Sequence, residues 1–219
     1  MSHFGVYVCL APGAEADWQA AVAAVMAPFR IDDETGLGEW DHWHPSGQFL
    51  VRPEYADSPL ILPSTRWPAD PLRCDGGPKR MLDLEGMRTA ARDRAGQLWA
   101  AWREAVSRHP PARSLETCAS REAYEAQPLI AEIRARSDDE GDVFGLLWTD
   151  GRDEVTYLGD DEQRFLDTAV ESALMTYALV TLDGRWLDME QTPAFASLVW
   201  PCLEGLPEDA FVIELDCHC

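Results

Sequence analysis

Apolar residues near both ends of the chain fall in short runs that predict strands. Residues 3–10 (HFGVYVCL) are rich in β-branched and aromatic side chains and are stopped by Pro12, which is typical of a buried strand. Residues 49–52 (FLVR) and 210–217 (AFVIELDC) have the same character. The sequence therefore predicts a strand at the start of the chain, one near residue 50 and one at the end.

Two further segments carry hairpin signals. In residues 176–189 (TYALVTLDGRWLDM), an apolar strand leads to Asp183-Gly184, a pair typical of a type I′ turn, and then to a return strand. Residues 137–162 form an acidic segment, with ten acidic side chains against one arginine. An Asp-Gly pair at 150–151 lies there between two apolar runs, so this segment is a candidate hairpin as well.

Apolar residues that recur at steps of three and four predict amphipathic helices. The expected helices cover residues 15–28, 83–109, 120–136, 161–174 and 193–204. Asp83 and Ser120 are the predicted N-caps of the second and third helices. Prolines limit them, because Pro28 should end the first helix and Pro128 should kink the third.

Strands followed by helices, then hairpins, predict an α+β fold with a mostly antiparallel sheet and helices packed on one face. The length of 219 residues suits a single domain over residues 1–219. Residues 53–78 hold six prolines and a Gly-Gly pair, so we expect an irregular excursion there.

The net charge of −21 restricts the possible partners. It arises from 39 acidic against 18 basic residues. Such a field repels the phosphates of nucleic acids, which proteins neutralise with clustered Lys and Arg. Direct nucleic-acid binding is therefore not expected, whereas an acidic surface suits a basic protein partner, a divalent metal ion or plain solubility.

The chain shows neither a signal peptide nor a run of about 20 apolar residues that would span a bilayer. Its six cysteines form no CxxC pair, so we expect reduced thiols in a cytoplasmic protein that does not enter a membrane.

Chemically versatile side chains are most concentrated in residues 38–49 (GEWDHWHPSGQF), named here the aromatic segment. Its tryptophans could stack on a base or a sugar, its aspartate could accept a hydrogen bond, and its glycines would permit close approach. The opposing interpretation, which we favour, is that the tryptophans anchor the core. The candidate binding residues are Trp40, Asp41, His42, Trp43, His44 and Gly47, together with Arg185 and Trp186 of the 176–189 hairpin.

No cofactor is predicted, although zinc is an alternative at the chain end. Cys217, His218 and Cys219 could combine with His42 and His44, which share one face of an extended strand. Two separate short motifs of this kind are much less specific than paired CxxC units. A buried, apolar role for Cys217 in the last strand is the preferred interpretation.

Several motifs, taken in order, resemble a family of uncharacterised proteins of tailed phages, prophages and actinobacterial genomes. They are the aromatic segment, Leu82–Arg88, Thr176–Val180 leading into Asp183–Trp186, Leu206–Asp209, and Asp216-Cys217-His218. Residues 50–78 and 137–160 lie outside the resemblance. The family's Gly-Gly-Arg-Trp stretch is Ser46-Gly47-Gln48-Phe49 here, so an anion-binding arginine is missing. The resemblance implies a small acidic accessory protein.

Catalytic signatures such as a P-loop, HExxH or a nucleophile elbow are not found in the sequence. We therefore expect a non-enzymatic accessory protein that binds another protein, one candidate being a basic nucleic-acid enzyme of the host. The aromatic segment and the 176–189 hairpin would make the contact. The alternative is a small hydrolase or a nucleotide- or metal-binding enzyme that binds a small molecule at Trp40–His44.

Overall fold

The computed structural model describes residues 3–32, 34–138, 141–147 and 152–219. The chain groups into two compact units: unit 1 comprises residues 1–88 and 171–219, and unit 2 comprises residues 89–170. The sequence predicts that residues 1–219 fold as a single domain. A grouping into compact units does not test whether each unit folds independently, so this stays a prediction.

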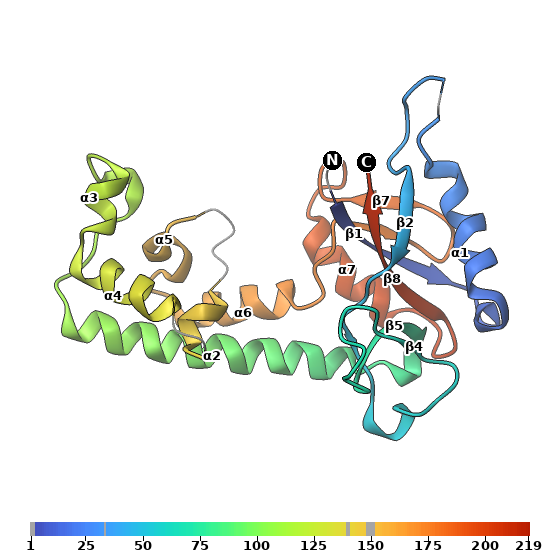
Figure 1. The fold of residues 1–219 in the computed structure, drawn as a ribbon, viewed down its shortest axis with the longest axis horizontal. Coiled ribbons are helices and arrows are strands. Elements are labelled where there is room, and N and C mark those ends of the chain that lie inside the picture. The colour runs from blue at the N-terminus through green and yellow to red at the C-terminus, as the bar shows by residue number, and fades with distance from the viewer. Residues whose placement is uncertain (1–2, 33, 139–140, 148–151) are drawn as a thin grey trace. The chain divides into compact units, whose positions relative to one another are not determined.

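Unit 1 is built on an eight-stranded sheet (Figure 1). Its strands are β1 (His3–Leu10), β2 (His42–Pro45), β3 (Phe49–Leu50), β4 (Leu62–Pro63), β5 (Arg73–Pro78), β6 (Ala178–Val180), β7 (Trp186–Asp188) and β8 (Phe211–His218). The order is β3-β5-β8-β1-β6-β7, with β2 beside β8 and β4 beside β5. All pairs are antiparallel except β1 with β6. The α+β class with a mostly antiparallel sheet is thus confirmed.

The last strand, β8, is the centre of this sheet. Along one edge it pairs with β1 over its whole length, from His3 opposite His218 to Leu10 opposite Phe211. The other edge is divided, because β5 pairs with its first three residues and β2 with its last four. Glu214 lies at the changeover between these two neighbours.

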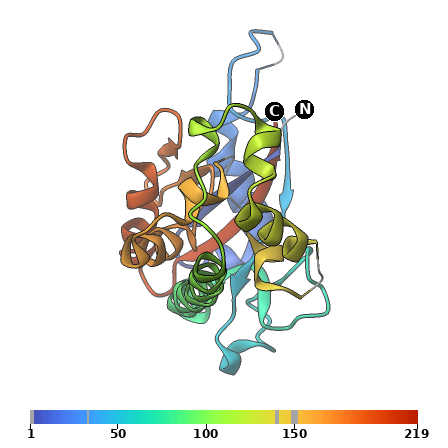
Figure 2. The ribbon, with the colours of Figure 1, turned by 90° about the vertical axis from the view of Figure 1, so that its left-hand side faces the viewer.

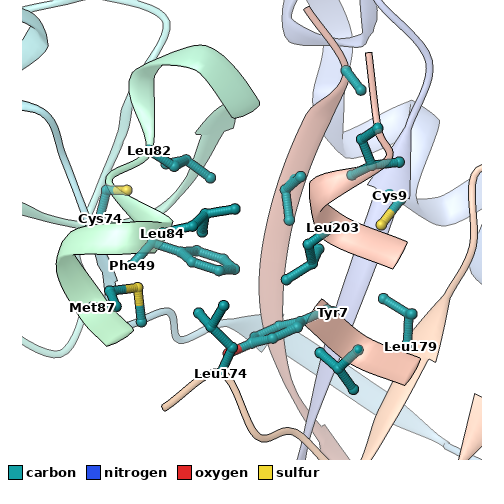
Figure 3. Close-up of a cluster of buried hydrophobic side chains, with 14 of the residues drawn as sticks. Tyr7, Cys9, Phe49, Cys74, Leu82, Leu84, Met87, Leu174, Leu179 and Leu203 are labelled. Carbon is teal, nitrogen blue, oxygen red and sulfur yellow. The ribbon is translucent and has the colours of Figure 1, made fainter. Parts of the chain in front are cut away.

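Helices cover both faces of the sheet, whereas the sequence predicts cover on one face only. On one face, α1 (Trp18–Met26) packs against residues such as Val6 and Val8 of β1. On the other, α7 (Phe195–Glu204) and the start of α2 (Leu84–Arg108) pack around Tyr7 (Figure 3). Both faces need cover because β1 and β8 carry apolar side chains on each of them. Short 3-10 helices in this unit are η1 (Ala14–Asp17), η2 (Ala27–Phe29), η3 (Pro53–Tyr55) and η4 (Lys79–Met81).

Unit 2 is helical and has an apolar core of its own. Besides most of α2 it contains η5 (Leu115–Thr117), α3 (Arg121–Glu125), α4 (Pro128–Ser137), η6 (Val143–Leu146), α5 (Glu154–Leu158) and most of α6 (Glu162–Ser172). Trp99 and Trp102 of α2 pack there with Ile133 of α4 and Phe165 of α6. Within the part of the chain that the structure describes, no helix combines the length and apolar character needed to cross a membrane.

The predicted helix caps lie where the sequence places them. The backbone N–H of Gly86 donates to the Asp83 carboxylate (3.0 Å), and that of Ala123 donates to the Ser120 hydroxyl (3.2 Å). Pro128 does more than kink its helix, because α3 ends before it and α4 begins at it. The cause is that proline favours the first helical position and restricts the residue before it.

Three predictions of local structure are wrong. The runs on either side of residues 148–151 form η6 and α5, not the strands of a hairpin; the Asp-Gly pair itself lies outside the described residues. The β6–β7 turn is not type I′, since Gly184 has a positive φ (78°) but Asp183 does not. Residues 73–78, expected to be irregular, form the six-residue strand β5.

We predict opposite effects from removing two buried tyrosine hydroxyls. Among the described residues, the buried hydroxyl of Tyr7 has no hydrogen-bond partner. That of Tyr124 donates to the Glu154 carboxylate (2.7 Å) and accepts from the Glu154 backbone N–H (3.1 Å). Tyr7→Phe should raise the free energy of unfolding by about 1 kcal/mol, and Tyr124→Phe should lower it by about 1–3 kcal/mol. Urea unfolding of each variant beside the wild type measures both. Destabilisation by Tyr7→Phe would show that its hydroxyl is hydrogen-bonded.

Candidate functional site

Four of the five histidines lie at the end of the sheet where the chain terminates. Pairing places His3 of β1 and His42 of β2 on either side of His218 in β8. In the next row on the same face, Asp216 lies between Gly5 and His44. We name the six residues His3, Asp41, His42, His44, Asp216 and His218 the histidine–aspartate face.

Two carboxylates contact three of these four histidines. His3 Nδ1 lies 3.1 Å from one oxygen of Asp216, and His44 Nε2 lies 3.7 Å from the other. His218 Nδ1 lies 2.7 Å from Asp41, and this hydrogen bond holds the pKa of the Asp41 carboxyl below its ordinary value. The rings of His3 and His218 meet edge to face, with centroids 5.3 Å apart. The chain therefore gathers imidazole and carboxylate groups from three neighbouring strands.

The aromatic segment divides between this face and the core. Trp40 is only 7% exposed, and its indole N–H donates to the carbonyl of Met26 (3.2 Å). Trp43 is half-buried opposite Cys217, on the face that α1 covers. The side chains of His42 and His44 point to the other face because successive strand residues alternate. The tryptophans thus anchor the segment to the core, and the histidines are its exposed side chains.

Gly47 permits a close approach, but of the protein's own backbone. A Cβ at this position would lie 2.4 Å from the Cα of Asp75 in β5. Three successive N–H groups are taken up at this turn, residues 46–48: Ser46 donates to the Glu214 carbonyl (3.1 Å), Gly47 to the Asp75 carboxylate (2.7 Å) and Gln48 to the Glu214 carboxylate (3.0 Å). Two buried carboxylates therefore hold the 46–48 turn against the sheet.

The carboxyl group of Glu214 has an unusual environment. It is buried, and burial, with smaller effects from the Asp75 and Asp216 carboxylates, raises its pKa from 4.5 to about 7. Arg66 and the Gln48 N–H act in the opposite direction. Burial also raises the pKa of Asp75, although hydrogen bonds from Gly47 and Thr65 partly oppose it.

A shallow depression with a volume of about 640 Å³ opens beside the start of the 46–48 turn. Its lining residues are His44, Pro45, Ser46, Thr65, Arg66 and Asp216. An imidazole, a carboxylate, a guanidinium and two hydroxyls therefore border one open volume. This set can donate to, accept from or ligate a small polar molecule.

The 176–189 hairpin lies apart from this face in the sheet, because β8, β1 and β6 separate β7 from β2. Arg185 forms an ion pair with Asp183 (2.9 Å), and the Trp186 indole donates to Asp188 (3.0 Å). The Trp186 ring also packs against Phe29 of η2, with centroids 5.2 Å apart. These contacts hold the hairpin together, and the structure does not bring it to the histidines.

The candidate zinc ligands at the chain end point in different directions. Cys217 is buried in the apolar cluster beneath α1, whereas His218 belongs to the opposite face, and Cys219 follows the end of β8. In the described residues, no group of three or more His, Cys, Asp or Glu side chains is arranged, as it stands, to hold a metal ion. Zinc binding by these cysteines gains no support from this geometry.

Sequence reasoning missed five residues of this region: His3, Thr65, Arg66, Asp75 and Glu214. His3 and Asp75 could be assigned only once β1 and β5 were known to flank β8. A signal for Glu214 was available, since it is the first acidic residue in the apolar run AFVIE. A carboxylate in a central strand is costly to bury, which marks it for attention.

Comparison with models of protein families, with curated proteins and with solved structures found no match to this chain.

Glu214 leads to a pH-dependent prediction. Its raised pKa means that the folded protein binds the proton more tightly than the unfolded chain, so stability should fall as pH rises from about 4.5 to about 7. Glu214→Gln keeps an oxygen for the Gln48 N–H but carries no charge. We expect this variant to be more stable than the wild type at pH 8 by about 3 kcal/mol, and close to it at pH 4.

Urea unfolding at both pH values, in the presence of a chelator, measures this difference. An equal difference at pH 4 and pH 8 would show that Glu214 does not titrate in this range.

Proposed function

We propose that the protein is a non-enzymatic, acidic accessory protein, of the kind carried by phages and prophages, that binds a basic partner protein. The contact would be made by the loop of residues 30–41, named here the acidic loop, which leads into β2. The observation that carries the proposal is an exposed apolar residue at its tip: Leu37 is 73% exposed, more than any other large apolar residue among those described.

The acidic loop stands clear of the body of unit 1, beyond the sheet end that carries both termini (Figures 1 and 2). At its base, the Ile31 N–H donates to the Trp40 carbonyl (2.7 Å) and the Glu39 N–H to the Phe29 carbonyl (2.8 Å). Gly38 fits here because a Cβ would lie 2.6 Å from the Arg30 carbonyl. The buried indole of Trp40 then fixes the base to the core.

The tip is also held by hydrogen bonds. Asp32 accepts from the backbone N–H groups of Glu34 (3.0 Å) and Thr35 (2.8 Å) and from the Thr35 hydroxyl (2.9 Å). These bonds lower the pKa of Asp32, so its carboxylate stays charged. The Asp32 N–H donates to the Leu37 carbonyl (2.9 Å). These hydrogen bonds restrain the described residues of the loop, and residues restrained before binding lose less entropy on binding, which favours a contact role.

Charge supports a basic partner. Asp32, Glu34, Glu39 and Asp41 belong to the same loop as the exposed leucine, and the whole chain carries a net charge of −21. An apolar anchor with a charged rim is the usual composition of a binding hot spot. The favoured partner is therefore a protein whose basic surface contains an apolar pocket, and a nucleic-acid enzyme of the host meets that description.

We predict that Leu37→Asp strongly weakens capture of this partner. The immobilised protein should retain a small set of basic proteins from a lysate of cells that naturally contain it. Their retention should fall steeply as salt rises, because surface charges are screened. Loss of the leucine anchor should weaken binding at least tenfold, on the scale of about 2 kcal/mol for a hot-spot residue. Mass spectrometry of the retained proteins, followed by titration of the purified partner, gives the affinity.

Leu198→Asp on α7, where the leucine is 38% exposed, is the matched control and should bind like the wild type. If Leu37→Asp and Leu198→Asp behaved alike, the acidic loop would not be the contact. If the purified protein hydrolysed nucleotides, esters or phosphoesters at enzymatic rates, the non-enzymatic proposal would be wrong.

A second candidate is a small hydrolase or nucleotide-binding enzyme. The depression beside His44 and Asp216 favours it, since a titratable pair there borders an open volume with Arg66. Activity that is lost in Asp216→Asn and kept in Leu37→Asp would select this candidate over protein binding.

A further inference from the structure

We propose that His3, His44 and Asp216 bind a divalent first-row transition-metal ion as a two-histidine, one-carboxylate site. This site goes beyond the protein-binding proposal and does not depend on it. It differs from the cysteine set considered at the chain end, because all three residues lie on the face of the sheet opposite to Cys217 and come from three adjacent strands.

Two of the three distances between donor atoms are close to those found around one shared ion. Ligand atoms about 2.0–2.2 Å from a metal lie roughly 3 Å from one another. His3 Nδ1 is 3.1 Å from Asp216 Oδ1, and His44 Nε2 is 3.7 Å from Asp216 Oδ2. The carboxylate thus lies between two imidazole nitrogens, one at each oxygen. For the ion to bind, the third distance, between the two imidazole nitrogens, must also close to roughly 3 Å by rotation of the imidazole rings.

The side chains have room for that rotation. The side chains of His3 and His44 are 62% and 52% exposed, and that of Asp216 is 29% exposed. Beside Asp216 on the β1 side lies Gly5, which has no side chain, although the Thr176 hydroxyl and the Glu214 carboxylate border the space above it. The backbones of β1, β2 and β8 are meanwhile fixed by the ladder, so the three Cα positions are already set. Only side-chain torsions need to change for the ion to bind.

One proposed ligand has a neighbour that can orient it. His44 Nδ1 lies 3.1 Å from the Pro45 carbonyl, and a hydrogen bond from Nδ1–H to this oxygen would leave Nε2 as the nitrogen that binds the metal. Ligands that are oriented by neighbouring hydrogen bonds bind metals more tightly. Two carboxylates, Asp41 and Asp216, add the negative charge that attracts a cation.

Open coordination positions would face the depression next to the site. His44 and Asp216 line it together with Thr65 and Arg66. Two imidazoles and one carboxylate leave positions free for water or an exchangeable ligand, and this donor set suits Zn²⁺, Co²⁺, Ni²⁺ or Fe²⁺ rather than Mg²⁺ or Ca²⁺. Arg66 would favour an anionic exchangeable ligand.

Calorimetric titration of the chelator-stripped, full-length chain with Zn²⁺ at neutral pH tests the proposal. We expect one ion per chain with saturable binding. His3→Ala, His44→Ala and Asp216→Ala should each weaken binding on the order of 10–100-fold. His42→Ala is the matched control, because His42 shares the face and the strand of His44 but lacks its contact with Asp216; it should bind like the wild type.

Co²⁺ absorption identifies the donors. Nitrogen and oxygen ligands give weak visible bands only, whereas thiolate ligands add intense near-ultraviolet charge transfer, and Cys219→Ser should leave the spectrum unchanged. Equal affinities in the wild type and the three ligand variants would overturn the proposal, as would a thiolate spectrum that Cys219→Ser abolishes. Because Leu37→Asp should leave metal binding intact, failure here is distinguishable from failure of the protein-binding proposal.

Discussion

The hydrogen bonding of β8 is the constraint on which unit 1 depends. The strand is central in the sheet and mostly buried, so its peptide groups must find partners within the protein. β1 pairs with all of it on one side. On the other side β5 and β2 divide the edge, and a gap remains at Glu214. The 46–48 turn fills that gap, since the Ser46 N–H reaches the Glu214 carbonyl.

Filling the gap this way brings charge into the core. The next two N–H groups of the turn also need acceptors, and the Asp75 and Glu214 carboxylates supply them. Burial of the Glu214 carboxyl is the main reason that its pKa rises to about 7, and the neighbouring Asp75 carboxylate adds a smaller increase. The same arrangement places the depression and Asp216 directly beyond the turn. A requirement of backbone pairing therefore also shapes the candidate site.

Residue patterns predicted β1, β8, the long helix α2 and its Asp83 cap because each depends on local chemistry. β5 was missed because its glycines resemble a turn. They are needed instead for packing, since a Cβ on Gly76 would lie 2.4 Å from the Val212 carbonyl. The wrong hairpin has a related cause. Short apolar runs fit a strand or a buried helix equally well, and Phe144 and Leu158 pack in the core of unit 2 from helical turns.

The aromatic segment shows how far the sequence could predict a site. Its alternation of Trp and His indicated that the histidines share a face, and this is how β2 is built. Its partners could not be predicted, because His3 and Asp216 join it only through the register of two other strands.

The tryptophans and histidines also have coupled roles. Since Trp40 and Trp43 fix β2 to the core beneath α1, they fix the direction of His42 and His44 as well. A tryptophan substitution would therefore disturb the acidic loop and the histidine–aspartate face together, whereas changes at Leu37 or Asp216 affect them one at a time.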